Sequence, residues 1–127
     1  MSYVIIVTVL LLIQYTFFAM RAGQARGKGE VKAPAVSGDE NFERSLRIQI
    51  NTLEQLIITI PAMLICAFYF RSDVAAILGF IFIIGRFIYS AAYLGDPTKR
   101  GTGMMIGFMA NVALLLCCLY AAVIVLI

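Results

Sequence analysis

Long apolar runs dominate this chain of 127 residues, and they lie at residues 3–20, 56–70, 74–94 and 104–127. A helix rises 1.5 Å per residue, so about 20 apolar residues are needed to cross a hydrocarbon core of about 30 Å. Hydrophobic residues make up 62% of the chain and charged residues 13%, far from the balance of a soluble domain. The β-branched residues lie inside continuous runs rather than short alternating segments, which argues against strands. We therefore predict an all-α, integral membrane four-helix bundle.

The residues that flank the apolar runs extend them into helices of a single domain that covers residues 1–127. Gly, Pro and mixed charges without periodicity predict a loop at residues 27–40, and Ser37 or Asp39 is expected to cap the helix that follows. Asp96 followed by Pro97 is typical of an N-cap and the first position of a helix. The predicted helices are at about 3–25, 41–70, 74–95 and 97–127.

Basic residues cluster around two of the three predicted connections. Arg71 is the only basic residue at the second connection, whereas the first and third hold Arg21, Arg26, Lys28, Lys32, Arg44, Arg47, Lys99 and Arg100. By the positive-inside rule, the first and third connections face the cytoplasm and both termini face the opposite side. The net charge of +3 then reflects topology and contact with membrane lipids, so no nucleic-acid partner is expected.

The absence of histidine limits the chemistry that this chain can perform. It excludes Ser-His-Asp catalysis, HExxH zinc sites and histidine-ligated haem. Cys66, Cys117 and Cys118 lie inside apolar runs without CxxC spacing, so we interpret them as small core residues. No metal is expected, and any acid–base chemistry must use carboxylate, Tyr, Lys, Cys or the substrate.

A polar segment, FERSLRIQINTLEQ at residues 42–55, directly precedes the second apolar run. On a helix, one face within roughly 80° carries Arg44, Arg47, Asn51 and Glu54, while Gln49 points almost oppositely. Ionisable groups inside a membrane cost about 2.5–3.5 kcal/mol each, so their default interpretation is functional. The alternative is a structural network of charged and tyrosine side chains that fastens subunits together.

A second polar face follows on the third predicted helix. Arg86, Tyr89 and Tyr93 occupy positions i, i+3 and i+7, and the short connection around Arg71 makes this helix antiparallel to the one before. The two polar faces should therefore lie at the same depth. Together with Arg100 they offer cations, a carboxylate, amides and hydroxyls, which suit a small, mostly anionic zwitterion better than a metal.

Two multi-residue motifs carry a resemblance to a known family. The first is ER-x2-R-x-Q-x-N-x2-E, formed by Glu43, Arg44, Arg47, Gln49, Asn51 and Glu54. The second is GR-x2-Y-x3-Y, formed by Gly85, Arg86, Tyr89 and Tyr93, and Arg100 follows it by seven residues. The chain resembles, over essentially its whole length, the membrane-associated proteins in eicosanoid and glutathione metabolism, the MAPEG family.

This resemblance implies a homotrimer that binds glutathione at the cytoplasmic side, between neighbouring subunits. One subunit would contribute most of the site, and Arg26 and Gln49 would come from the next. The residues that the resemblance assigns to the first subunit are Arg47, Asn51, Glu54, Tyr89, Tyr93 and Arg100. Arg86 is expected to complete the glutathione site.

The resemblance also assigns the chemistry. Arg100 would stabilise the glutathione thiolate and lower the thiol pKa from about 8.5, each unit being about 1.4 kcal/mol, and Tyr89 would donate a hydrogen bond to the same sulfur. The thiolate would attack a lipophilic electrophile or a lipid hydroperoxide, so we expect a glutathione transferase with possible peroxidase activity in detoxification.

Some positions depart from individual branches of the family. Gln55 stands where the leukotriene C synthase type has tyrosine, and Tyr89 stands where the prostaglandin E synthase branch has histidine. These differences favour a general transferase or peroxidase over an eicosanoid-type synthase. A non-catalytic lipid-binding or scaffold protein on the same fold, and a small proton-coupled transporter, are the remaining alternatives.

Overall fold

The computed structural model describes residues 1–127 and is entirely helical. Its elements are α1 (Ser2–Lys28), α2 (Glu40–Tyr69), α3 (Ser72–Gly95), a short 3-10 helix η1 (Pro97–Lys99) and α4 (Gly101–Leu126). Four helices are long and apolar enough to cross a membrane, the last of them counted together with η1. The prediction of an all-α protein with four membrane-length helices is confirmed.

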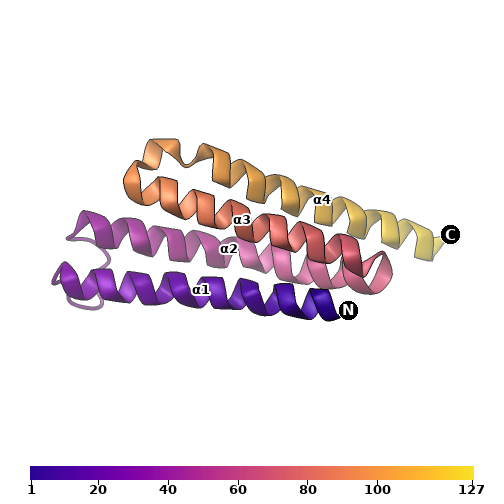
Figure 1. Ribbon diagram of the computed structural model, residues 1–127, viewed down its shortest axis with the longest axis horizontal. Coiled ribbons are helices and arrows are strands. Elements are labelled where there is room, and N and C mark those ends of the chain that lie inside the picture. The colour runs from indigo at the N-terminus through magenta and orange to yellow at the C-terminus, as the bar shows by residue number, and fades with distance from the viewer.

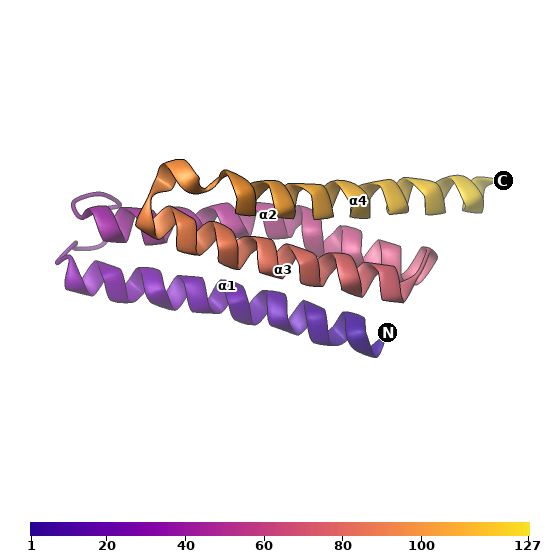
Figure 2. The ribbon, with the colours of Figure 1, turned by 45° about the horizontal axis from the view of Figure 1, so that its top comes forward.

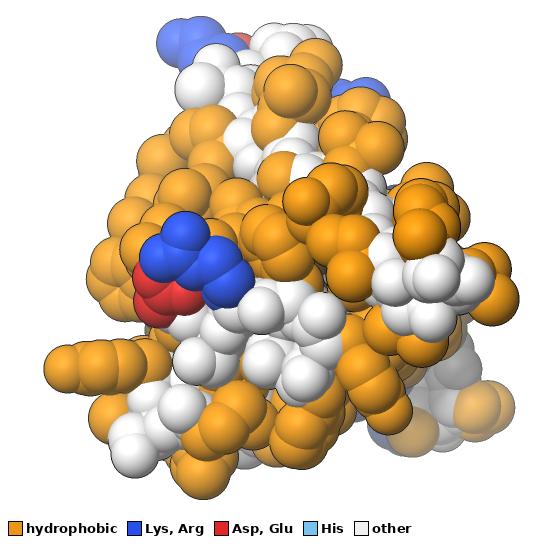
Figure 3. Space-filling model, turned by 90° about the vertical axis from the view of Figure 1, so that its right-hand side faces the viewer, with side chains coloured by type: hydrophobic (Ala, Val, Ile, Leu, Met, Phe, Trp, Pro, Cys, Tyr) orange, Lys and Arg blue, Asp and Glu red, His pale blue; other side chains and the backbone are white.

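The helices run up and down in a bundle: in Figure 1 they follow chain order, and in Figure 2 α3 lies between α1 and α4. The α1–α2 loop and the α3–α4 connection lie at one end of the bundle, which we call the connection end, and both chain termini lie toward the other. Viewed from that other end, hydrophobic side chains cover most of the surface around a small charged cluster (Figure 3). The two basic connections therefore share one end, as the positive-inside argument requires, and their cytoplasmic placement stays a prediction.

Local hydrogen bonds explain where the helices begin. Asp39 caps α2, because its carboxylate accepts a hydrogen bond from the backbone nitrogen of Phe42 at 2.9 Å. Asp96 accepts from the backbone nitrogen of Thr98 at 3.1 Å, as an N-cap should, but the turn that it caps is 3-10. The prediction that an α-helix begins at residue 97 is therefore wrong, since α4 begins at Gly101 and Arg100 is its N-cap.

The first helix is longer than predicted. It continues to Lys28, and the backbone nitrogen of Gly29 closes it by donating to the carbonyl of Ala25 at 2.9 Å. Gly27 does not interrupt it, because a glycine lowers helix stability by only about 1 kcal/mol relative to alanine. The predicted loop at 27–40 is therefore too long at both ends, because Gly27 and Lys28 belong to α1 and Glu40 belongs to α2.

Polar side chains inside the bundle bond across helices. Gln14 on α1 donates from Nε2 to the carbonyl of Ile83 on α3 at 2.9 Å. Asn111 on α4 accepts from the Thr59 hydroxyl at 2.6 Å and donates to Oε1 of Gln55 at 3.1 Å, both on α2. These bonds join α1 to α3 and α4 to α2, as polar side chains within membrane helices commonly do.

Glycines bring α3 and α4 into backbone contact near the connection end. A Cβ atom on Gly103 would lie 2.7 Å from the carbonyl oxygen of Gly85, and a Cβ on Gly85 would lie 2.9 Å from the nitrogen of Gly107. Only residues without a side chain permit this approach. It sets the distance between the helix that carries Arg86 and the helix that follows Arg100.

Cys66 lies in the main core cluster with Met63 and Ala75, which agrees with its interpretation as a core residue.

Candidate functional site

A cavity of about 570 Å³ opens at the connection end, and we call it the polar cavity. Its walls come from the α1–α2 loop, the first turns of α2, the last turn of α3 and η1. Two predicted site residues on different helices, Arg47 and Tyr93, line it, so the expected meeting of the two polar faces is observed. The full lining is Val36, Glu40, Glu43, Arg44, Leu46, Arg47, Ile50, Tyr93 and Pro97.

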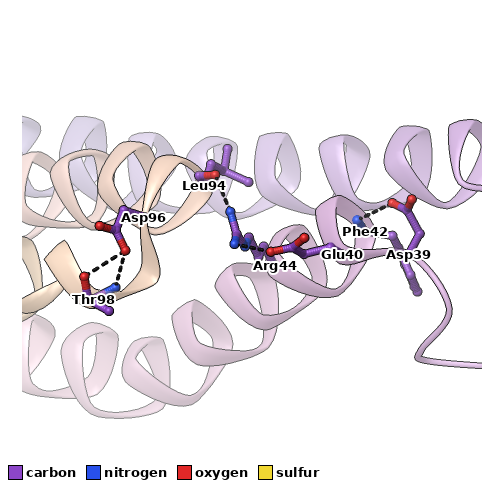
Figure 4. A network of polar contacts seen from close by, with 7 residues as sticks. All are labelled: Asp39, Glu40, Phe42, Arg44, Leu94, Asp96 and Thr98. Atoms are coloured by element: carbon purple, nitrogen blue, oxygen red, sulfur yellow. Dashed lines mark hydrogen bonds and ion pairs between the residues drawn. The ribbon is translucent and has the colours of Figure 1, made fainter.

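Arg44 joins the two sides of the polar cavity (Figure 4). Its Nη1 donates to the carbonyl oxygen of Leu94 at the end of α3 at 3.0 Å, and its Nη2 pairs with the Glu40 carboxylate one turn earlier on α2. The sequence placed Arg44 on the polar face but gave it no function. The i,i+4 spacing of Glu40 and Arg44 was the only local indication of a contact for Arg44. Its bond to Leu94 depends on how α2 and α3 pack.

The connection that carries Arg100 is held by side-chain bonds. Both the backbone nitrogen and the hydroxyl of Thr98 donate to the Asp96 carboxylate (Figure 4), at 3.1 and 2.7 Å. The hydroxyl bond is the main reason that the pKa of Asp96 lies below its usual value. Arg100 is exposed and donates from Nη1 to the carbonyl of Pro97 at 2.7 Å, next to the polar cavity that Pro97 lines.

Arg86 and Tyr89 are both about 2% exposed and lie deeper in the bundle than the polar cavity. Nη2 of Arg86 donates to the Thr52 hydroxyl on α2 at 2.9 Å, and its guanidinium carbon lies 4.2 Å from the centre of the Tyr89 ring. The Tyr89 ring in turn lies 5.6 Å from the ring of Tyr93. A continuous stack therefore runs from the buried arginine to a residue that lines the polar cavity. Thr52 was missed by sequence reasoning, because it lies among charged and amide residues of the polar segment and a threonine carries no distinctive signal beside them.

The other predicted glutathione-binding residues do not line the polar cavity within one chain. Arg26 donates from Nη1 to the carbonyl of Ala35 at 2.7 Å. Gln49 donates from Nε2 to the Tyr15 hydroxyl at 3.3 Å. Asn51 is buried and its Oδ1 has no partner, whereas Glu54 is exposed.

One further polar contact was not predicted. Nη2 of Arg21 on α1 donates to the Ser90 hydroxyl on α3 at 2.6 Å, and the Arg21 guanidinium lies 5.0 Å from the centre of the Phe18 ring. Sequence reasoning had placed Arg21 in water beyond the first apolar run. No group of three or more Cys, Asp or Glu side chains is placed to hold a metal ion.

Comparison with known proteins identifies the family. The model of the MAPEG family matches residues 4–120. This chain belongs to the MAPEG family. Its resemblance to that family, based on two motifs, is thereby confirmed.

Several relatives share most of the chain. An uncharacterized protein of Synechocystis is 38% identical over 109 residues, 86% of this chain and 80% of its own length. Human microsomal glutathione S-transferase 2 is 37% identical over 111 residues, 86% of this chain and 76% of its own length. Bovine leukotriene C4 synthase is 26% identical over 94 residues, 74% of this chain and 63% of its own length. With its four membrane-length helices, this MAPEG chain is an integral membrane protein.

Proposed function

We propose that this MAPEG protein is a membrane-bound glutathione transferase that activates the glutathione thiol for attack on lipophilic electrophiles or lipid hydroperoxides. The observation that carries the proposal is the polar cavity, in which Arg47 and Tyr93 meet from two helices beside the connection that holds Arg100. The similarity to microsomal glutathione S-transferase 2, a transferase by name, supports the same reaction class.

The charges around the polar cavity suit glutathione, which carries two carboxylates, an ammonium group and peptide amides. Arg47 is available for a carboxylate, since neither ion pair of the structure involves it. Glu54 is exposed one to two turns further along α2 and offers a partner for the ammonium group. Asn51 is proposed to contact a peptide amide, and its amide oxygen is buried without a partner within one chain. This face of α2 therefore provides partners for both charge signs of the peptide.

Arg100 is the proposed thiolate-stabilising residue. An arginine does not act as a base at neutral pH, so its effect on the thiol is electrostatic: the nearby cation favours the charged sulfur and lowers the thiol pKa. Tyr89 is proposed to donate a hydrogen bond to the same sulfur, while Arg86 holds the Tyr89 ring from behind. The thiolate then attacks an electrophilic carbon of a substrate that enters from the membrane, and a leaving group departs from that carbon or its epoxide C–O bond breaks. With a lipid hydroperoxide it attacks the terminal oxygen, the O–O bond breaks to release the lipid alcohol, and a second glutathione reduces the sulfenic acid to give the disulfide and water.

We propose a homotrimer in which the glutathione site is completed by a neighbouring subunit. Within one chain neither Arg26 nor Gln49 lines the polar cavity, and each already has a hydrogen-bond partner. Their proposed contact with glutathione is therefore to the site of the next subunit. Cross-linking of the purified protein at low detergent concentration tests this assembly, and a monomeric, fully active protein would refute it.

The decisive experiment compares Arg100→Ala with Lys99→Ala. Both changes remove one exposed cation from the same connection, so they match in charge and position. We expect Arg100→Ala to abolish the thiolate absorbance that appears when glutathione is added and to lower turnover of a generic electrophile by at least about a hundredfold. Lys99→Ala should leave both unchanged. Equal effects of the two changes would rule out Arg100 as the stabilising residue.

An eicosanoid-type synthase is the second candidate function, because leukotriene C4 synthases are also relatives at 26–28% identity. The higher identity to microsomal glutathione S-transferase 2 favours the general transferase. Turnover of generic electrophiles and lipid hydroperoxides, measured beside a leukotriene-type epoxide, separates the two. A protein that binds lipid but turns over none of these substrates would instead be a scaffold member of the family.

A further inference from the structure

Arg21 is a half-buried cation between α1 and α3, near the connection end, and it has no counterion. Neither ion pair of the structure includes it. Its Nη2 donates to the Ser90 hydroxyl at 2.6 Å, but its Nε is buried without a hydrogen-bond partner. Its guanidinium carbon lies 5.5 Å from the centre of the Phe17 ring and 5.0 Å from that of Phe18. Two aromatic rings and one hydroxyl do not neutralise a guanidinium, so this arrangement leaves a place for an anion.

An apolar groove of about 540 Å³ lies between α1 and α3, and we call it the α1–α3 groove. Phe17, one turn before Arg21 on α1, lines it together with Phe87 on α3. Leu10 and Phe80 line it deeper in the membrane. All four of these apolar side chains are exposed, so the groove is open to lipid along the outside of the bundle. Arg21 therefore lies where this groove approaches the connection end.

The α1–α3 groove has the depth of one leaflet of a membrane. Leu10 precedes Arg21 by eleven positions, which is about 16 Å along the axis of α1 at 1.5 Å per residue. Half of a hydrocarbon core of about 30 Å is about 15 Å. The wall is apolar apart from Gln14, which is 2% exposed and donates to the carbonyl of Ile83. A molecule with an anionic headgroup at Arg21 and an acyl chain along the groove matches this geometry.

The charges along this side of the bundle favour a headgroup with a net negative charge. Beyond Arg21 on the same helix lie two more cations, Arg26 and Lys28. Toward the other end of the bundle, the α1–α3 groove continues into a second apolar groove of about 520 Å³, with which it shares two lining residues. Asp73 lines this second groove and pairs with Arg71, so no uncompensated cation lies there. Only the leaflet at the connection end therefore offers an arginine fork for a phosphate.

We infer that the α1–α3 groove binds an acyl chain of an anionic membrane phospholipid, with Arg21 as the hydrogen-bond donor to its phosphate. The site is separate from the polar cavity, since the two share no lining residue. The inference goes beyond the proposed transferase activity and does not depend on it, because binding of this lipid requires neither glutathione nor turnover.

The test uses tryptophan fluorescence, because the chain contains no tryptophan and a single one reports on its own surroundings. Phe87→Trp places the reporter in the α1–α3 groove, and Ile77→Trp places it in the second groove as the matched control. The full chain is reconstituted into phosphatidylcholine vesicles that contain increasing amounts of brominated phosphatidylglycerol or brominated phosphatidylcholine. Quenching by each brominated lipid gives the relative affinity of the groove for the two headgroups.

We expect the Phe87→Trp protein to favour phosphatidylglycerol about fivefold, which corresponds to the effect of about 1 kcal/mol for one basic residue at an anionic surface. Ile77→Trp should show no preference. In the Phe87→Trp background, Arg21→Gln should abolish the preference. Lys28→Gln, which removes an exposed cation two turns further along α1, should retain it.

Ser90→Ala keeps the test decisive if Arg21→Gln fails to fold. It removes only the hydroxyl that holds the Arg21 guanidinium at the groove, and it should lower the preference by at least about twofold. Equal quenching of Phe87→Trp by the two lipids, the same preference in Ile77→Trp, or an unchanged preference in Arg21→Gln or Ser90→Ala would overturn the inference.

Discussion

Replacement of Gly103 by alanine tests the contact that sets the spacing of α3 and α4. The new Cβ would overlap the backbone nitrogen of Tyr89 and lie 2.6 Å from its Cα and 2.7 Å from the carbonyl oxygen of Gly85. All three atoms belong to the backbone, so no side chain can rotate away. Since ordinary contact begins at 3.4 Å and the Tyr89 nitrogen is the nearest of the three atoms, the helices must separate by at least about 1 Å at this level.

The magnitude follows from that separation. A gap of 0.5–1 Å forfeits about a quarter to a half of the dispersion energy of the contacts across it, and overpacking of this kind costs about 1–3 kcal/mol. Alanine favours the helix over glycine by up to about 1 kcal/mol, which offsets part of this cost. We therefore expect a net destabilisation of about 1–2 kcal/mol. Tyr89 lies at this contact and Arg100 immediately precedes α4, so a change in helix spacing displaces both proposed catalytic residues. Glutathione turnover should therefore fall as well.

The assay is unfolding in mixed micelles with increasing SDS, followed by far-UV circular dichroism, with Gly107→Ala as the control. Gly107 lies one turn further along the same helix, and its new Cβ would make only ordinary contacts. We expect Gly107→Ala to be neutral or stabilising. If Gly103→Ala is as stable as Gly107→Ala, the two helices do not approach in this way and the reasoning is refuted.

Two other predictions concern polar groups that hold the bundle together. Asn111→Leu removes the donor to Gln55 and the acceptor of Thr59, and should lower the free energy of unfolding by about 1–2 kcal/mol in the same SDS titration. The control Leu115→Ala, on the exposed side of α4, should lower it less. Equal losses of stability in the two variants would contradict the bond network. The pKa of Asp96 is lowered in the folded protein, so its stabilisation is present above the usual aspartate value of about 3.9 and is lost as pH falls through the folded value. Asp96→Ala should therefore lower the Tm at pH 7, and the difference from wild type should shrink as the pH falls below about 3.9. A difference that does not vary with pH would refute the cap.

Much of the candidate site could be predicted because helical geometry relates sequence spacing to direction. The positions of Arg47 and Tyr93 on their helices, and the antiparallel hairpin around Arg71, were enough to place both residues at the connection end, where they line one cavity. The motifs also sufficed to indicate the family, which the match over residues 4–120 establishes. The assignment of glutathione contacts stays a prediction for every site residue: Arg26, Arg47, Gln49, Asn51, Glu54, Arg86, Tyr89, Tyr93 and Arg100.

The contacts that could not be predicted are those that depend on how the helices pack. The bond from Arg44 to the Leu94 carbonyl joins residues 50 apart in sequence, and the bond from Arg86 to Thr52 joins residues 34 apart. Neither pairing has a local signal, because a carbonyl is present at every residue and a threonine is common in membrane helices. The 3-10 turn after Asp96 was missed for a related reason, since an N-cap residue does not determine which kind of helix follows.

The sequence by itself determined the number of helices, their approximate bounds and the end at which charge gathers, because the length and polarity of each run must match the membrane. The tertiary structure decided that Arg86 is buried against Thr52 and Tyr89, and that Arg47 and Tyr93 share a cavity. Helical periodicity gives the direction of a side chain but not its depth or its neighbours. Those depend on the distance between helices, which here follows from the backbone contact at Gly85 and Gly103.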